Sequence, residues 1–236
     1  YSGVELPPNG FPKLDLAEAE RVAKGTLTAG SVTINGVYSG NVTLDGNSSP
    51  IKITGEVLIK GDAIISGTYS GRGTIYATGN IYIADSVRPT KSAFPFSSSK
   101  EAASQEGRDK AGDQSLDALA LAAKSSIIVG NPSDRAVELT PTRTAPPVDA
   151  NNVTKWNPGY IGMVVAKFGP SIVTTIEAFL YSENLIAGKI GSYVINGGLM
   201  CDSFHILGTR GTTIPNTNSV NYDYRFAGGL DLLQAL

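Results

Sequence analysis

The sequence predicts an all-β protein built as a parallel β-helix (a β-solenoid), with about eighteen residues in each turn. Glycine recurs every six residues, at positions 55, 61, 67, 73 and 79. Residues with β-branched or aromatic side chains fill the intervals, as in Val57-Leu58-Ile59 and Ile81-Tyr82-Ile83. Three intervals make one three-sided turn, and glycine allows a sharp bend at each corner. We expect the coil to be right-handed.

A short helix is expected over residues 14–24, before the coil begins. This stretch is rich in helix formers, acidic early and basic late, and Gly25 follows it. We expect the helix to cap the open end of the coil, because an uncapped end would expose unpaired strand edges. The strand-like pieces that follow are each bounded by Gly, Asn or Asp: residues 31–34, 41–44, 51–53, 57–59, 63–65, 74–77 and 81–83.

Alternation along these strands gives each side chain a direction. If Val57 points inward, Leu58 points outward, and the same phasing places Ile64, Tyr76 and Tyr82 outward. A turn of about eighteen residues stacks Tyr76 over Leu58 and Tyr82 over Ile64. Each of two outer faces then carries a row of stacked apolar side chains, which we call an apolar ladder. Such a row is expected to be covered by the chain's own loops, by a partner or by a ligand.

Two long insertions interrupt the pattern, over residues 86–115 and 131–160. The first is polar and has no strand period, and the second contains five prolines. Strand character returns between them, at residues 116–123, where a helix competes with a strand, and at residues 126–130. The coil resumes after the second insertion. We therefore expect one domain over residues 1–236, with two long loops on its flank.

Several segments resemble the β-helical passenger region of bacterial envelope proteins associated with type IV pili. The resemblance rests on Gly73–Ile83, Leu116–Gly130, Ala178–Leu207 and Asn221–Arg225, about two thirds of the chain. It implies surface display and pilus proteins as partners. The glycine spacing is also similar to that of bactofilins, which polymerise but are usually shorter and lack such loops. Cellulose-binding surface adhesins of the tāpirin type are a further β-helical group with a similar loop-decorated pattern.

Composition narrows the function classes. The chain has 236 residues and a net charge of −2, without a long basic run, so a nucleic-acid partner is not expected. Charged residues make up only 17% and glycine is abundant, which suits a secreted or surface protein. No stretch is long and apolar enough for a membrane span. The chain starts at Tyr1, so we expect a fragment or a processed product.

The sequence indicates no catalytic residue, no metal site and no cofactor. The single histidine, His205, is interpreted as a surface residue, and the single cysteine, Cys201, as a small core residue. Paired carboxylates could act as acid and base on a polysaccharide. However, acidic residues at predicted corners normally bind the turn backbone, and this is the interpretation given to Asp45, Glu56, Asp62 and Asp85.

Aromatic residues are the remaining candidates for ligand binding. Trp156 and Tyr160 lie in the second insertion, and Tyr76 and Tyr82 lie on the predicted outward faces. Exposed aromatic rings bind sugars by stacking and apolar contact. The alternative is that aromatic residues of the insertions, which also include Phe94 and Phe96, pin these segments onto the Tyr76 and Tyr82 ladders.

The favoured function is a non-catalytic module displayed on the cell surface or outside the cell. It would mediate adhesion to an insoluble polysaccharide or another cell-surface component, in connection with type IV pili. Two alternatives stay open. One is a polysaccharide lyase or hydrolase on the same scaffold, which predicts a groove with clustered carboxylate, Lys or Arg side chains. The other is a structural polymer of the bactofilin kind.

Overall fold

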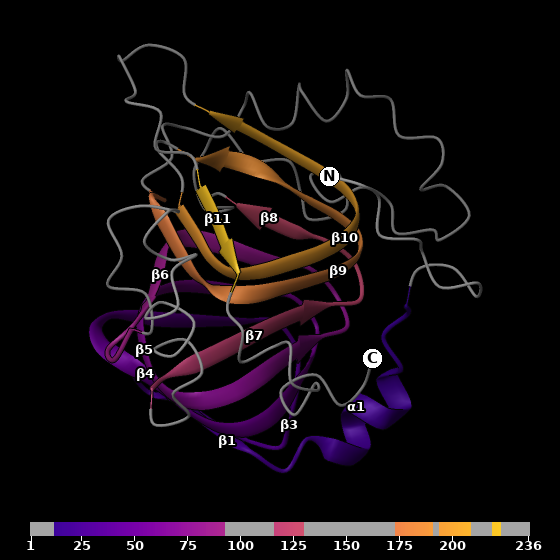
Figure 1. Cartoon of the computed structure of the whole chain (residues 1–236). Helices are drawn as coiled ribbons and strands as arrows, with labels where there is room; N and C mark the ends of the chain where they lie inside the picture. The colour runs from indigo at the N-terminus through magenta and orange to yellow at the C-terminus, as the bar shows by residue number, and fades with distance from the viewer. Residues whose placement is uncertain (1–11, 93–115, 130–172, 191–193, 209–218, 223–236) are drawn as a thin grey trace.

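The computed structural model describes residues 12–92, 116–129, 173–190, 194–208 and 219–222. These residues form one short helix and a single sheet of eleven strands (Figure 1). In chain order the elements are α1 (Leu16–Val22), β1 (Thr26–Ala29), β2 (Val32–Asn35), β3 (Val37–Ser39), β4 (Val42–Lys60), β5 (Ala63–Ala77), β6 (Ile81–Pro89), β7 (Ala118–Ala123), β8 (Ile127–Val129), β9 (Thr175–Ile190), β10 (Val194–Gly208) and β11 (Ser219–Tyr222).

The prediction of an all-β protein is confirmed, but the prediction of a right-handed parallel β-helix is wrong. Strand accounts for most of the described residues, and five parallel strands close into a barrel around a central axis. The sheet is also not parallel throughout, because β1 pairs in the antiparallel direction with both β2 and β4. Figure 1 shows the long strands curving around the barrel axis.

The physical reason for the difference lies in the strands themselves. A three-sided coil needs short flat strands separated by corners, whereas β4 has 19 residues and β5 has 15, and both run through the expected corners. Among the recurring glycines only Gly55 and Gly67 have positive φ, at 71° and 83°. Gly73 instead allows close approach between strands: a Cβ there would lie 2.1 Å from the carbonyl oxygen of Gly55. The six-residue spacing of the glycines therefore reflects close approach between curved strands at some positions and bends at others.

Side-chain alternation along the strands is as the sequence predicts. Val57 pairs with Ile75, Ile75 with Leu121, and Leu121 with Leu180, and all four are buried in the inner core. The predicted outer neighbours also pair, Leu58 with Tyr76 and Ile64 with Tyr82. These predictions of direction and register are confirmed.

The helix lies elsewhere than expected. It begins at Leu16 and ends at Val22, inside the predicted range 14–24. It does not cap an end of the barrel but packs against the outer face of the wall. Its buried side chains join a separate outer cluster, whose members are Leu14, Ala19, Val22, Ala23, Leu58, Tyr76, Ala120, Ala122, Phe179 and Tyr181.

The two predicted insertions fall mostly outside the described residues. Strand β6 includes residues 86–89 and pairs with β5 there, through Gly67 and Val87. The remainder of the first stretch lies outside the description from residue 93 onward, and residues 131–160 lie outside it entirely. Between them, residues 118–123 form strand β7 and not a helix.

Candidate ligand-binding surface at the roots of two chain segments

Two long segments of the chain, residues 93–115 and 130–172, lie outside the described residues, and the residues that flank them are described. The ends of the first segment are held together by Asp117. The backbone N–H of Asp117 donates to the carbonyl oxygen of Lys91 at 3.2 Å. Its Oδ2 accepts from the backbone N–H of Lys91 at 2.8 Å and from the Thr90 hydroxyl at 2.6 Å. Its Oδ1 accepts from the backbone N–H of Gly71 at 2.8 Å.

The second segment starts and ends beside strand β6. It follows Val129, which pairs with Ile83 of β6. Where the chain resumes, the Ser86 hydroxyl oxygen accepts from the backbone N–H groups of Thr174 and Thr175, at 3.0 and 3.3 Å. The Arg88 guanidinium donates to the hydroxyls of the same two threonines, at 3.0 and 3.1 Å. We call the described residues that flank each segment its root. The first root continues from the end of strand β6, and the second root contacts that strand.

Glu177 connects the two roots. Its carboxylate accepts a hydrogen bond from the hydroxyl of Ser92, at the start of the first segment. Its carbonyl oxygen accepts from the hydroxyl of Tyr69 at 2.8 Å. Arg88 is exposed and Glu177 is partly exposed, because their neighbours Val87 and Ile176 point into the core and pair with each other. We call this patch the root surface; it comprises Arg72, Ser86, Arg88, Thr90, Lys91, Ser92, Asp117, Thr174, Thr175 and Glu177.

The root surface combines both signs of charge with hydroxyl groups. Its cations are Arg72, Arg88 and Lys91, and its anions are Asp117 and Glu177. Asp117 is only 6% exposed, and both of its oxygens already accept hydrogen bonds. Such a mixture of donors and acceptors suits a ligand rich in hydroxyl groups better than a strongly charged polymer.

In the ranges that the structure describes, no three side chains of the His, Cys, Asp and Glu types come together as a metal site. Cys201 packs partly against the inner core, and burial raises the pKa of its thiol to about 11. The thiol is therefore protonated at neutral pH and is a poor nucleophile. The side chain of His205 lies outside the description.

The aromatic residues predicted to bind ligand are placed as follows. Tyr76 is completely buried in the outer cluster, between Leu58 and Ala122 of the neighbouring strands. Tyr82 is 3% exposed, and its hydroxyl oxygen accepts from the Asn80 amide at 3.5 Å. Neither belongs to the root surface, and Trp156 and Tyr160 lie outside the described residues. The outward ladder of Leu58 and Tyr76 is covered by the chain's own helix.

Sequence reasoning did not identify Arg88, Asp117 or Glu177. None of them stands in a recognisable motif, and each lies far along the chain from its partners. A weak signal exists for Asp117, a lone acidic residue directly before the apolar run Ala118-Leu119-Ala120. A carboxylate at the start of a buried strand is expected to bind backbone N–H groups.

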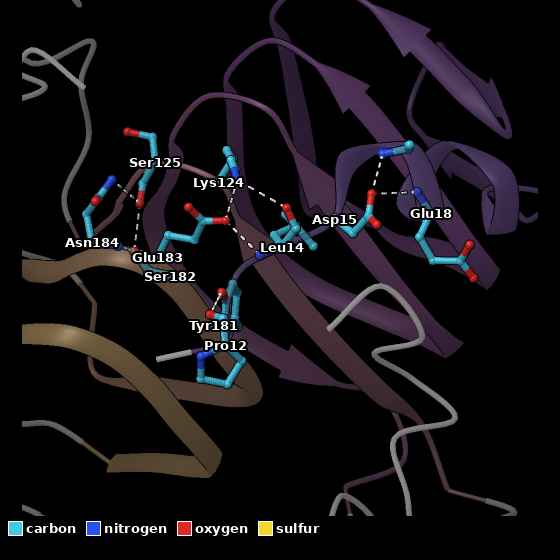
Figure 2. A network of polar contacts seen from close by, with 11 residues as sticks. Pro12, Leu14, Asp15, Glu18, Lys124, Ser125, Tyr181, Ser182, Glu183 and Asn184 are labelled. Atoms are coloured by element: carbon cyan, nitrogen blue, oxygen red, sulfur yellow. Dashed lines mark hydrogen bonds and ion pairs between the residues drawn. The ribbon is translucent and has the colours of Figure 1, made fainter. Parts of the chain in front are cut away.

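A second polar arrangement fixes the N-terminal part of the described chain to the barrel wall (Figure 2). We call residues 12–23 the strap. The Leu14 N–H donates to Glu183 Oε1 at 2.7 Å, and Lys124 Nζ donates to the Leu14 carbonyl oxygen at 3.1 Å. Lys124 and Glu183 form an ion pair at 2.5 Å. The Tyr181 hydroxyl donates to the Pro12 carbonyl oxygen at 2.5 Å.

Comparison of the chain with protein-family models, with curated proteins and with solved structures finds no match. The class that the molecule defines is therefore structural: an all-β protein whose parallel strands close into a barrel. Within the described ranges, no helix has the length and apolar character needed to cross a membrane.

Proposed function

We propose that the chain is a non-catalytic binding module, displayed on the cell surface or outside the cell, that mediates adhesion to a polysaccharide or another cell-surface component. The observation that supports this most directly is the shared root of two long segments on strand β6. Long segments held on a rigid scaffold are where proteins usually carry binding function. Here the scaffold is a closed barrel wall, and the carboxylate of Glu177, on the strand that follows the second segment, accepts a hydrogen bond from Ser92 at the start of the first segment.

The chemistry of the residues supports a carbohydrate ligand. The root surface offers two guanidiniums, an ammonium group, two carboxylates and several hydroxyls, and these groups bind sugar hydroxyls by hydrogen bonds. The two rooted segments contribute aromatic residues by sequence: Phe94 and Phe96 in the first, Trp156 and Tyr160 in the second. Aromatic rings stack on the apolar faces of sugar rings. Trp156, Tyr160 and Arg88 are therefore the proposed ligand contacts.

A connection with type IV pili is the finer part of the proposal. It is supported by the resemblance of the Gly73–Ile83 and Ala178–Leu207 segments to pilus-associated envelope proteins. Antibody labelling of intact cells, with and without pili, tests it. We expect surface labelling that is lost or displaced in cells without pili. Equal labelling of both kinds of cell would contradict the connection but not the adhesive function.

Adhesion is tested by retention of the protein on insoluble polysaccharides and on whole cells. The variants Trp156→Ala and Arg88→Ala are each expected to bind about tenfold more weakly, because a central interface anchor typically contributes this much or more. The matched control is Arg21→Ala, which removes an exposed arginine on α1 that pairs only with Glu18 among the described residues. Failure of the unmodified protein to bind any of these materials would overturn the proposal.

One observation favours a second candidate, a polysaccharide lyase or hydrolase. Arg88, Lys91, Asp117 and Glu177 lie together at the root surface, as such an enzyme would require. The hydrogen bonds to Asp117 argue against it, because an acid or base must be able to exchange its proton with substrate. Release of reducing ends from a polysaccharide panel, abolished by Glu177→Gln, would establish the enzyme and overturn the non-catalytic proposal.

A further inference from the structure

The strap is bound to the barrel in the way that a groove binds a peptide. The wall contacts the strap mainly through backbone groups, namely the N–H and carbonyl of Leu14 and the carbonyl of Pro12. The Leu14 side chain is only 2% exposed and belongs to the outer cluster. We call the wall residues that make these contacts the strap seat: Leu58, Tyr76, Lys124, Phe179, Tyr181 and Glu183.

The helical part of the strap depends on this seat. Helix α1 has 7 residues, and an isolated helix of this length is unstable in water because nucleation is costly. Asp15 caps it by accepting from the backbone N–H groups of Ala17 and Glu18, at 2.9 and 3.0 Å. Burial of Ala19 and Val22 against the wall supplies the remaining stabilisation. The strap is thus folded when it is docked.

The connection between strap and barrel is short. Gly25 is already fixed to the barrel, because its N–H donates to the Glu56 carbonyl at 2.8 Å and its carbonyl accepts from Gly36 at 2.8 Å. The helix ends at Val22, and Ala23 has non-helical backbone angles, with φ −67° and ψ 78°. The strap ends at Ala23, which is buried in the outer cluster, and the exposed Lys24 forms its pivot. Short connections of this kind favour exchange of a terminal element between copies.

We propose that the strap seat of one copy also accepts the strap of a second copy, so that two copies of the chain can be linked by strap exchange. Every contact described above is the same whether the strap comes from its own chain or from another. The polar contact between Glu20 of the strap and Lys60 of β4, at 2.7 Å, adds charge complementarity. This proposal is independent of the adhesive function.

The protein concentration decides whether a strap docks on the seat of its own chain or on the seat of another copy. Because the strap is tethered to its own chain, its effective concentration at that chain's seat is roughly millimolar or above. The exchanged form is therefore favoured when copies are crowded, for example after refolding of concentrated protein. It forms when the strap opens, and it is retained when the strap docks again on the neighbouring seat.

A cross-linking experiment on the full chain tests the proposal. Unlabelled and ¹⁵N-labelled protein are mixed, unfolded together in urea and refolded over a range of concentrations. A carbodiimide then joins Lys60 to Glu20 as an amide, with loss of water. After proteolysis, a linked peptide with one labelled and one unlabelled half reports a strap on another copy's seat. We expect this mixed peptide in the dimer fraction, and we expect its share to rise with concentration.

The internal control is Lys52, an exposed lysine on the same strand β4. Random encounters would link Glu20 to Lys52 as often as to Lys60, whereas seating links Glu20 to Lys60 selectively. Two results would overturn the proposal. One is linked Lys60–Glu20 peptide of a single label at every concentration, and the other is mixed peptide in equal yield at Lys52 and Lys60.

Discussion

Polar side chains near the turns of this barrel serve the backbone of a nearby residue or of the next strand. Asn41 accepts from the Asp62 N–H at 2.9 Å, and Asp62 accepts from the Asn80 N–H at 2.7 Å. Asp45 and Asp85 accept from the N–H groups of Asn47 and Ser86. Asp45, Asp62 and Asp85 therefore bind backbone N–H groups as predicted, but Asp45 and Asp85 do so within strands β4 and β6, whereas Asp62 lies between β4 and β5. These carboxylates bind and stabilise the backbone. Two catalytic carboxylates that act as acid and base on a sugar would not need to do so.

Asp117 is expected to be the most costly of these carboxylates to remove. Replacement by Ala leaves the part-buried N–H groups of Gly71 and Lys91 without their acceptor. We expect Asp117→Ala to lower the free energy of unfolding by about 2 kcal/mol, since each internal hydrogen bond that is lost contributes about 1 kcal/mol. Urea denaturation measures the change.

The matched control for Asp117→Ala is Asp45→Ala, which removes an exposed carboxylate with two hydrogen bonds. Water can replace the lost acceptor there, so a loss below about 1 kcal/mol is expected. Equal losses for the two variants would show that Asp117 does not hold the root surface together.

Glu56 differs from the other acidic residues because desolvation by burial raises the pKa of its carboxyl above the ordinary 4.5. The charged form is thus disfavoured in the folded state. This cost is present at pH 7, decreases as the pH falls through the raised pKa, and is absent below the ordinary value. We expect Glu56→Gln to stabilise the protein at pH 7 by a few tenths of a kcal/mol, because the group is partly exposed.

The pH dependence of that gain checks the cause. Urea denaturation of both proteins at pH 7 and below pH 4.5 should show the gain only at the higher pH. A gain that is the same at both pH values would mean that desolvation of the carboxylate is not its source.

At the scale of elements, we expect the strap to open from the barrel as a unit, because it is a short terminal element packed on the outer wall. Its helix contacts the barrel on one face only, and the wall beneath it is continuous through pairings between β4, β5, β7 and β9. Elements of this kind often open as a unit while the remainder stays folded. We expect the ion pair of Lys124 and Glu183 to control that opening, because its side chains bind the backbone N–H and carbonyl groups of Leu14.

Glu183→Gln is therefore expected to speed amide hydrogen exchange in the strap about fivefold, which corresponds to about 1 kcal/mol of lost docking energy. Exchange in β4 and β5 should stay unchanged. Mass spectrometry of the exchanged peptides measures both regions.

Glu20→Gln is the control for the strap, since Glu20 pairs with Lys60 on the exposed surface. A surface pair contributes little, about 0–1 kcal/mol, so its effect on exchange should be smaller. Uniform acceleration across strap and barrel in Glu183→Gln would contradict independent opening of the strap.

At the scale of the whole molecule, closure of the barrel requires strands to approach very closely at particular residues. Gly67 of β5 pairs with Gly46 of β4, and a Cβ at Gly67 would lie 2.3 Å from the carbonyl carbon of Gly46. The φ of Gly67 is also positive, at 83°. Both the backbone angle and the space therefore exclude a larger residue.

Two glycine variants separate the effect of backbone angle from the effect of space. Gly30 has a φ of 56°, but no heavy atom lies within 4 Å of the position that a Cβ would take there. Gly30→Ala should cost about 1 kcal/mol, the conformational penalty alone. Gly67→Ala should cost at least about 2 kcal/mol more, because backbone atoms must move apart. Thermal or urea unfolding measures both, and similar losses would contradict tight closure at this point.

The alternation of inner and outer side chains was predictable from the sequence. Val57 and Ile75 are inner neighbours, and Leu58 and Tyr76 are outer neighbours, as the side-chain period of two and the glycine spacing imply. The same pattern fits a flat-faced coil and a curved barrel equally well. It therefore led to the wrong architecture, because curvature builds up over whole strands and is not visible in a six-residue interval.

The root surface could not be predicted in the same way. Arg88 meets Thr174 across 86 positions of sequence, and Gly71 meets Asp117 across 46. No local period relates residues so far apart, because the predicted insertions interrupt the strand pattern between them. The sequence did mark where these segments interrupt the strands, which is where their roots lie.

The sequence by itself determined the all-β class, the side-chain directions at residues 57–59, 63–65, 75–77 and 81–83 of β4, β5 and β6, and the pairing of Leu58 with Tyr76. These properties follow from local alternation, which the chain carries in its residue order. Only the tertiary structure decided the closure of the barrel, the docking of α1 on the outer wall, and the meeting of Arg88, Asp117 and Glu177. Those depend on free energies of contact between distant segments, which are gained only when the whole wall has formed.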